Sequence, residues 1–151
     1  MKNREVVLGV CGGIAAYKTA MLASRLVQAG AGVSVVMTEV AEAFIGKATF
    51  AALTGRAVHT ATISPDAHPL GPHIDLAEQG ELLCIAPATA NFLAKAAGGL
   101  ADDLLSTFYL AFPGPVLIAP AMNPDMWEKP AVQRNVNQLR EDGVTIIDPV
   151  E

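Results

Sequence analysis

The sequence predicts a three-layer α/β domain built on a mostly parallel, six-stranded sheet, and two observations carry this prediction. Short apolar runs alternate along the chain with stretches of helical periodicity, which is the pattern of β-α-β units. Several of these runs lack any polar side chain, as expected for strands that helices cover on both faces. The chain shows no repeat, low-complexity tract or linker, so a single domain is expected over residues 1–151.

The first half of the chain supplies three predicted strands and two helices. A strand at residues 6–10 (VVLGV) leads into a helix over 14–29, and Gly30 suits the left-handed residue that ends many helices. A second strand at 33–37 precedes a helix to about residue 53, with Thr38 as a possible cap. A weak strand is predicted at 56–60, and residues 64–72 form a loop by composition.

The second half supplies three further strands and three helices. The strands are expected at residues 82–86, 115–119 and 144–148. The helices are expected at 91–97, 103–112 and 131–142. The whole arrangement is Rossmann-like or flavodoxin-like, and such sheets bind ligands at the carboxyl ends of their strands.

Composition and charge exclude several classes of protein. Hydrophobic residues make up 52% of the chain, which indicates either apolar surface buried against other subunits or an alanine-rich core. The net charge of −5 and the lack of a Lys/Arg cluster argue against nucleic-acid binding. Residues 104–124 are uncharged, but "FPGPV" interrupts them, so no membrane span is expected. Cys11 and Cys84 lie in apolar strand-like runs, which predicts reduced, buried thiols of a cytoplasmic protein.

Two predicted strand ends offer groups that suit a phosphate. Gly12 and Gly13 separate the first strand from its helix, and side-chain-free backbone can approach an anion closely. The loop is neither GxGxxG nor a Walker sequence, so phosphate binding and a simple tight turn both stay open. Thr38 follows the second strand with a hydroxyl that favours a mononucleotide, and helix capping is the alternative.

Other polar residues allow two interpretations each. Thr89 and Asn91 are either helix caps or groups that line a flat, polar-edged ring. His73 directly precedes an apolar segment and is either an acid–base or orienting group or a structural residue. Asp102 and Asp103 resemble a helix cap more than a catalytic pair. No His, Cys or carboxylate pair has ligand spacing, so a metal site is not expected.

Three stretches together strongly resemble the homo-oligomeric flavin-containing cysteine decarboxylases. They are GVCGGIAAYK, GPHIDLAEQGELLCIAPATANFLAKAAGGLADDLLST and APAMNPDMWEKPAVQRN. The resemblance runs from about residue 6 to residue 148 and is closest to the members that act in coenzyme A biosynthesis. Its most specific part is residues 120–127 (PAMNPDMW) combined with His73.

The resemblance implies FMN as the cofactor, with the FMN site near a subunit boundary of a trimer, or of a dodecamer of four trimers. The FMN phosphate would lie near Gly12, Gly13 and Ile14, with help from Thr38. The isoalloxazine and ribityl groups would lie near Thr89, Ala90, Asn91 and Phe92.

The reaction implied by the resemblance is an oxidative decarboxylation of a cysteine-containing substrate. The expected substrate is 4′-phosphopantothenoylcysteine. FMN oxidises the cysteine side chain to a thioaldehyde, CO₂ leaves to give an enethiol, and the enethiol is then reduced. His73 matches the family's active-site histidine, and Asn123 matches the asparagine that holds the substrate carboxylate. Met126 would line the same pocket.

The sequence departs from this family at its end. Members in coenzyme A biosynthesis continue into a flap whose cysteine serves the final reduction, and this sequence stops at Glu151. We expect that the flap, or a synthase domain, belongs to a longer chain. The alternatives are a peptidyl-cysteine decarboxylase that releases the enethiol, a flavin prenyltransferase-like enzyme and a non-catalytic flavin-binding regulatory subunit. The last alternative is a flavodoxin-like electron carrier.

Overall fold

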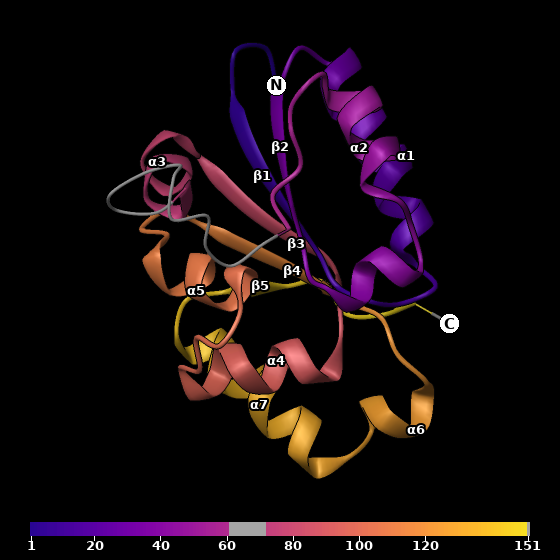
Figure 1. Ribbon diagram of the computed structural model, residues 1–151. Coiled ribbons are helices and arrows are strands. Elements are labelled where there is room, and N and C mark those ends of the chain that lie inside the picture. The colour runs from indigo at the N-terminus through magenta and orange to yellow at the C-terminus, as the bar shows by residue number, and fades with distance from the viewer. Residues whose placement is uncertain (61–71, 151) are drawn as a thin grey trace.

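The computed structural model describes residues 1–60 and 72–150, and its centre is a five-stranded parallel sheet with the order β2-β1-β3-β4-β5 (Figure 1). The strands are β1 (Glu5–Val10), β2 (Gly32–Met37), β3 (Leu82–Ala88), β4 (Val116–Pro120) and β5 (Thr145–Ile146). The α/β class and the parallel sheet predicted from the sequence are confirmed.

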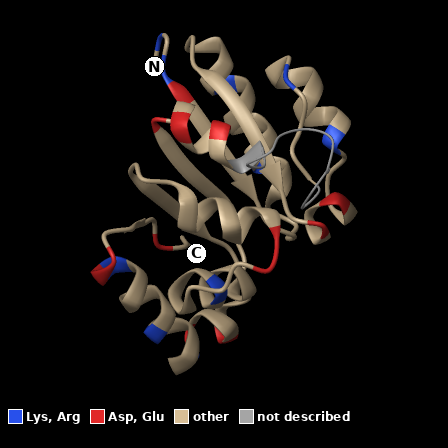
Figure 2. Cartoon of the chain, turned by 60° about the vertical axis from the view of Figure 1, so that its left-hand side comes forward, with Lys and Arg blue, Asp and Glu red and all other residues tan. Residues whose placement is uncertain are grey.

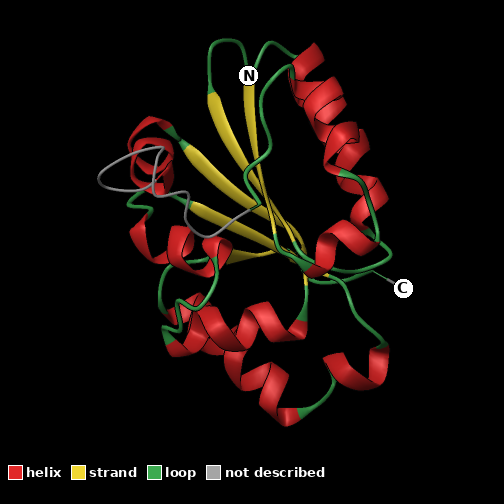
Figure 3. Cartoon of the chain, viewed as in Figure 1, coloured by secondary structure: helices red, strands yellow, loops and turns green. Residues whose placement is uncertain are grey.

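Helices cover both faces of the sheet (Figure 3). The helices are α1 (Ala16–Gln28), the 3₁₀ helix η1 (Val40–Ala43), α2 (Lys47–Thr54), α3 (Pro72–Gln79), α4 (Ala90–Gly98), α5 (Leu104–Ala111), α6 (Pro124–Trp127) and α7 (Pro130–Glu141). One layer holds α1 and α2, while α3, α4, α5 and α7 form the other (Figure 3). In the described part of the chain, none of these helices has the length and apolar character needed to cross a membrane.

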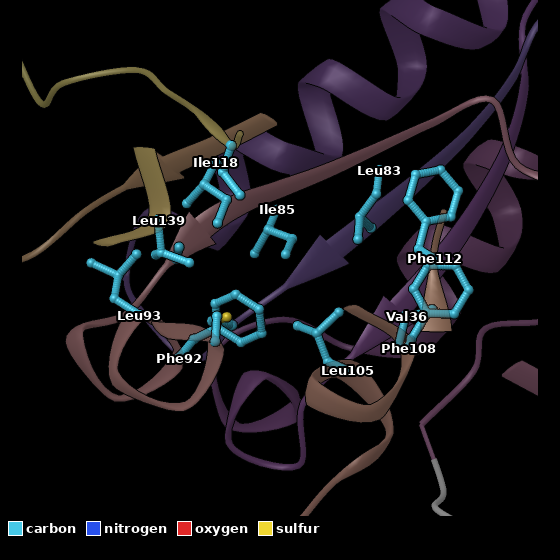
Figure 4. Packing of buried hydrophobic residues seen from close by; sticks show 14 of the residues in the cluster. Val36, Leu83, Ile85, Phe92, Leu93, Leu105, Phe108, Phe112, Ile118 and Leu139 are labelled. Carbon is cyan, nitrogen blue, oxygen red and sulfur yellow. The ribbon is translucent and has the colours of Figure 1, made fainter. Parts of the chain in front are cut away.

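The alternation of side chains along β1 explains why its sequence is apolar throughout. Val6 and Leu8 pack in the cluster under α1 and α2, whereas Val7 packs in the cluster on the opposite face. Figure 4 shows the second cluster, in which Ile85 and Ile118 meet side chains from α4, α5 and α7. Because each face of the sheet has its own core, a polar residue within these strands would be buried on either side.

The sixth predicted strand, at residues 56–60, does not form. The described residues there make a single parallel bridge to the sheet, between Val36 and His59. Arg56 turns instead to the amino end of the sheet, where its Nη1 lies 2.7 Å from Glu5 Oε2 and 3.0 Å from Ser34 Oγ. Two backbone hydrogen bonds, from the N–H of Met37 to His59 and from the N–H of His59 to Val35, hold this segment beside β2, but they do not extend into a ladder.

Two further differences from the sequence prediction concern helices. The helix expected from residue 38 to about residue 53 is broken into η1 and α2, because Gly46 adopts an extended conformation (ψ 140°) before α2 begins. The helices α3 and α6 were not predicted. The loop predicted at 64–72 falls almost entirely outside the described residues.

The register of the strands brings four chain segments to one edge of the sheet. Val10 at the end of β1 pairs with Met37, and Ala88 at the end of β3 pairs with Pro120. The N–H of Thr38 donates to the carbonyl oxygen of Val10 at 3.0 Å, which ties two of the exits together. Since β2 and β3 lie on opposite sides of β1, the strand order reverses here, and a ligand site is expected at this point.

A glycine within β1 provides a test of this packing. A Cβ on Gly9 would lie 2.7 Å from Cδ1 of Leu105 and 3.1 Å from Cγ1 of Ile85, and both side chains are fully buried. We expect Gly9→Ala to lower the free energy of unfolding by about 1–3 kcal/mol, as overpacking does. Urea denaturation would measure the change. Gly98→Ala is the matched control because its Cβ meets open space; equal stability of the two variants would contradict the prediction.

Candidate functional site

A cavity of about 640 Å³ opens at the carboxyl edge of the sheet, where the strand order reverses. Five of the eight residues predicted to bind a cofactor line it: Gly12, Thr38, Thr89, Asn91 and Phe92. The other three, Gly13, Ile14 and Ala90, adjoin these in sequence but are not part of the cavity wall. Most of the predicted cofactor residues therefore gather at one cavity, which extends further along α4 and α5 than predicted, and their role in binding a cofactor stays a prediction.

The glycine loop after β1 leaves backbone donors free. The N–H groups of Gly12, Gly13 and Ile14 donate to no other residue within the described part of the chain. The following helix α1 has no side-chain cap and no acidic residue in its first turn, so no group of the helix itself neutralises its positive end. A Cβ on Gly12 would lie 2.8 Å from Cβ of Val40, whereas a Cβ on Gly13 would meet open space. The loop can thus receive an anion from outside.

Thr38 and Thr89 each accept a hydrogen bond from a helix N–H and also lie on the cavity wall, and their role in cofactor binding stays a prediction. Oγ1 of Thr38 accepts a hydrogen bond from the N–H of Ala41 at 3.2 Å, and Oγ1 of Thr89 accepts one from the N–H of Phe92 at 3.2 Å. Both hydroxyls cap helices, yet both residues also line the cavity. Capping uses only an oxygen lone pair, so it fixes each hydroxyl without removing its ability to donate.

Both cysteines are free and buried, as predicted. Burial raises the pKa of the Cys11 thiol to about 12 and that of the Cys84 thiol to about 11. Hydrogen bonds from Thr89 to Cys11 act in the opposite direction but are the smaller effect. Both thiols therefore stay protonated at neutral pH, and neither is suited to act as a nucleophile.

A charged group on the cavity wall was missed from the sequence. Lys95 Nζ lies 2.8 Å from Asp102 Oδ1 and 3.5 Å from Asp103 Oδ2, and all three residues line the cavity. The hydrogen bond with Asp102 is the main reason why the pKa of Lys95 is raised and that of Asp102 is lowered. The spacing of four residues between Asn91 and Lys95 was the available signal, because it places both side chains on one helix face.

The prediction that the two aspartates cap a helix is confirmed for Asp103. Its Oδ1 accepts a hydrogen bond from the N–H of Ser106 at 2.8 Å, and the hydroxyl oxygen of Ser106 accepts one from the N–H of Asp103. The two bonds form a capping box at the start of α5. Ser106 is fully buried. The other Lys and Arg residues of the chain are spread over several helices and the N-terminal end (Figure 2).

The predicted substrate residues Asn123 and Met126 do not line this cavity. Asn123 caps α6, where its Oδ1 accepts a hydrogen bond from the N–H of Asp125 at 2.8 Å, and its side chain is exposed. Met126 is 47% exposed. The short helix α6 lies beside α7 and away from the sheet (Figure 1), while Trp127 packs against the core. One copy of the chain therefore does not bring the predicted cofactor and substrate residues together.

His73 lies in the first turn of α3, and its side chain is outside the described part of the chain. The helix packs against α5, whose N-terminal residues border the cavity. The role predicted for this histidine stays a prediction.

A second cavity, of about 360 Å³, was not predicted from the sequence. Its walls come from α1, the ends of β3 and β4, and residues 147–150. Thr19 on α1 donates from Oγ1 to the carbonyl oxygen of Ala86 at 2.5 Å, beside the cis peptide bond that precedes Pro87. The small apolar side chains at these strand ends gave no sequence signal, because such residues are equally common in a filled core.

The chain is similar to curated proteins of coenzyme A biosynthesis. The chain is 49% identical over 151 residues to the coenzyme A biosynthesis bifunctional protein CoaBC of Bacillus subtilis (strain 168), and 44% identical over 149 residues to that of Escherichia coli (strain K12). These alignments cover 100% and 99% of this chain but 37% of each relative. The chain thus spans little more than a third of the curated relatives that it matches.

Two solved structures are similar to the chain over nearly its whole length. The FMN-dependent cysteine decarboxylase SpaF superposes with a TM-score of 0.89 at 43% identity, covering 98% of this chain and 85% of SpaF. A PPC decarboxylase mutant complexed with pantothenoylaminoethenethiol superposes with a TM-score of 0.86 at 32% identity, covering 99% and 84%. The resemblance predicted from the sequence is confirmed, and since the flavoprotein family model matches residues 1–151, the chain belongs to the flavoprotein family.

Proposed function

We propose that the chain is an FMN-dependent carboxy-lyase that decarboxylates 4′-phosphopantothenoylcysteine to 4′-phosphopantetheine in coenzyme A biosynthesis. The observation that carries the proposal is the cavity at the carboxyl edge of the sheet, whose walls hold Gly12, Thr38, Thr89 and Asn91. The names of the CoaBC relatives and of the PPC decarboxylase structure support this choice of substrate. Residues 1–151 would then form the decarboxylase domain of the protein.

The groups at and beside the cavity offer hydrogen-bond partners for both ends of FMN. A phosphate dianion matches the free amides of Gly12, Gly13 and Ile14 at the positive end of α1. The hydroxyl of Thr38 adds a donor at the next strand exit. The amide of Asn91 suits the polar edge of a flavin ring, which donates and accepts hydrogen bonds.

Bound FMN would take two electrons from the cysteine side chain and return them after CO₂ has left, so the overall reaction has no net oxidation. Asn123 would hold the substrate carboxylate through its amide N–H₂. A neutral amide binds this carboxylate without strongly stabilising the charge that must be lost, whereas a lysine would favour the ground state. His73, at the start of α3, would orient the substrate or move a proton.

We propose further that a second copy of the chain completes the site, in a trimer or a dodecamer. The predicted substrate residues Asn123 and Met126 are exposed and lie outside the cavity of their own chain. Large apolar side chains are exposed next to the glycine loop, with Ile14 83%, Tyr17 56% and Val40 62% accessible. An apolar surface of this kind is suited to burial between subunits.

In the family that the chain resembles, a flap cysteine serves the final reduction of the enethiol, for which reduced FMN would supply the electrons. Cys11 and Cys84 are buried and line no part of the large cavity, so neither is placed to provide this thiol. We propose that a flap cysteine beyond residue 151 supplies it. Release of the enethiol, as by a peptidyl-cysteine decarboxylase, is the alternative that the product distinguishes.

The proposed reaction is tested by incubating the FMN-loaded protein, with the flap included, with 4′-phosphopantothenoylcysteine. We expect CO₂ release and, by mass spectrometry, the saturated thiol 4′-phosphopantetheine. A product lighter by two hydrogens would identify the enethiol and support the alternative. If neither product forms while FMN stays bound, the decarboxylase proposal is wrong.

Asn123→Asp tests the proposed carboxylate site. A second carboxylate would repel that of the substrate, so we expect turnover to fall on the order of 10²-fold or more while bound FMN and the fold are kept. Steady-state kinetics and the flavin absorbance measure the two properties. Asn137→Asp makes the same change on the exposed surface of α7 and should leave turnover unchanged. Wild-type turnover in Asn123→Asp would contradict the assignment.

His73→Asn tests the proposed acid–base or orienting histidine. We expect the variant to keep its yellow flavin and to lose about 10²–10⁴-fold in turnover, as removal of a general acid or base does. Flavin absorbance after purification reports cofactor binding separately from activity. A colourless variant would instead assign His73 a structural role.

A further inference from the structure

Lys95 is the one basic residue among the described residues that line the large cavity, and acidic residues surround it. Asp102 and Asp103 lie beside its ammonium group, and Glu39 and Glu42 of the segment after β2 line the same cavity. Four carboxylates and one ammonium group therefore border the space proposed for the flavin. The position of that single positive charge decides how the cavity stabilises an added electron pair.

The fold holds this ammonium group in one place. The side chain of Lys95 is only 16% exposed, and its Nζ is fixed between Asp102 at 2.8 Å and Asp103 at 3.5 Å. Asp103 is itself fixed by the capping box with the buried Ser106. A charge that is shielded from water and cannot rotate away acts more strongly on its surroundings than a surface lysine does.

Lys95 also lies on the part of the wall where a flavin ring is expected. It follows Asn91 by four residues on α4, so the two side chains share one face of the helix. Both residues line the cavity, and Thr89 caps the same helix at its start. The charge is therefore next to the residues assigned to the ring rather than to the glycine loop assigned to the phosphate.

We propose that Lys95 raises the reduction potential of the flavin bound in this cavity, and that Asp102 opposes it. The inference rests on the proposed function, because it needs FMN in this site. A reduced flavin carries more negative charge than an oxidised one, so a nearby ammonium group stabilises the reduced form. A carboxylate at the same place destabilises it.

The balance between the two charges suits the proposed reaction. A flavin held beside Asn91 and Lys95 would have to accept two electrons from a cysteine side chain and later return them to the enethiol. A strongly oxidising flavin would retain the electrons, and a strongly reducing one would not accept them. A lysine that is partly offset by carboxylates gives an intermediate field, which both steps require.

The test compares the midpoint potential of the bound flavin in Lys95→Met and Asp102→Asn with that of the wild-type protein, by spectrophotometric redox titration. We expect a more negative potential in Lys95→Met and a more positive potential in Asp102→Asn. Both variants break the same 2.8 Å ion pair. A purely structural role of this pair would shift both potentials in the same direction, and that result would overturn the inference.

Two further variants complete the experiment. Lys95→Arg keeps the charge and should keep a potential near that of the wild type. Lys2→Gln is the control, because it removes one positive charge at the exposed N-terminus, away from the cavity, and should leave the potential unchanged. If Lys95→Met loses its flavin, Asp102→Asn decides alone: an unchanged or more negative potential overturns the inference. Wild-type protein that binds no FMN would instead refute the proposed function.

Discussion

Burial of the strands on both faces is the constraint on which the rest of the structure depends. Val7 faces one core and Leu8 the other, so a polar side chain within β1 would lose its water on either side. Polar groups that must stay accessible are therefore confined to the strand exits. The cysteines show the effect directly, because burial is the main reason why the pKa of the Cys11 thiol is raised to about 12, and this thiol stays protonated at neutral pH.

The strand exits are rigid because their polar groups also hold the helices. Thr38 and Thr89 each accept a hydrogen bond from a helix N–H, and Asp103 does the same in its capping box. The cavity wall is thus built from groups whose positions are already fixed by capping. For this reason capping and ligand binding, between which the sequence left the choice open at both threonines, are compatible with each other. A fixed hydroxyl loses little conformational entropy when a ligand arrives.

The sequence predicted those parts of the molecule that depend on local chemistry. The apolar runs gave five strands, and the residues at the strand ends gave five of the residues that line the cavity. The prediction failed where contacts between residues far apart in the sequence determine the structure. The segment 56–60 forms a single bridge to β2 and places Arg56 against Glu5, and the ion pair of Lys95 with Asp102 depends on how α4 and α5 meet. The exposure of Asn123 could not be predicted either, since a family resemblance does not say which copy of a chain uses a residue.

Under the proposed function, the two ends of the reaction need opposite electrostatic treatment. The substrate carboxylate loses its charge when CO₂ leaves, so a neutral amide such as that of Asn123 is preferable to a cation beside it. The flavin gains charge when it is reduced, so a cation such as Lys95 is useful there. Separate elements carry the two groups, α6 for the amide and α4 for the ammonium group. If they exchanged places, the carboxylate would be held too firmly to leave and the flavin would accept electrons less readily.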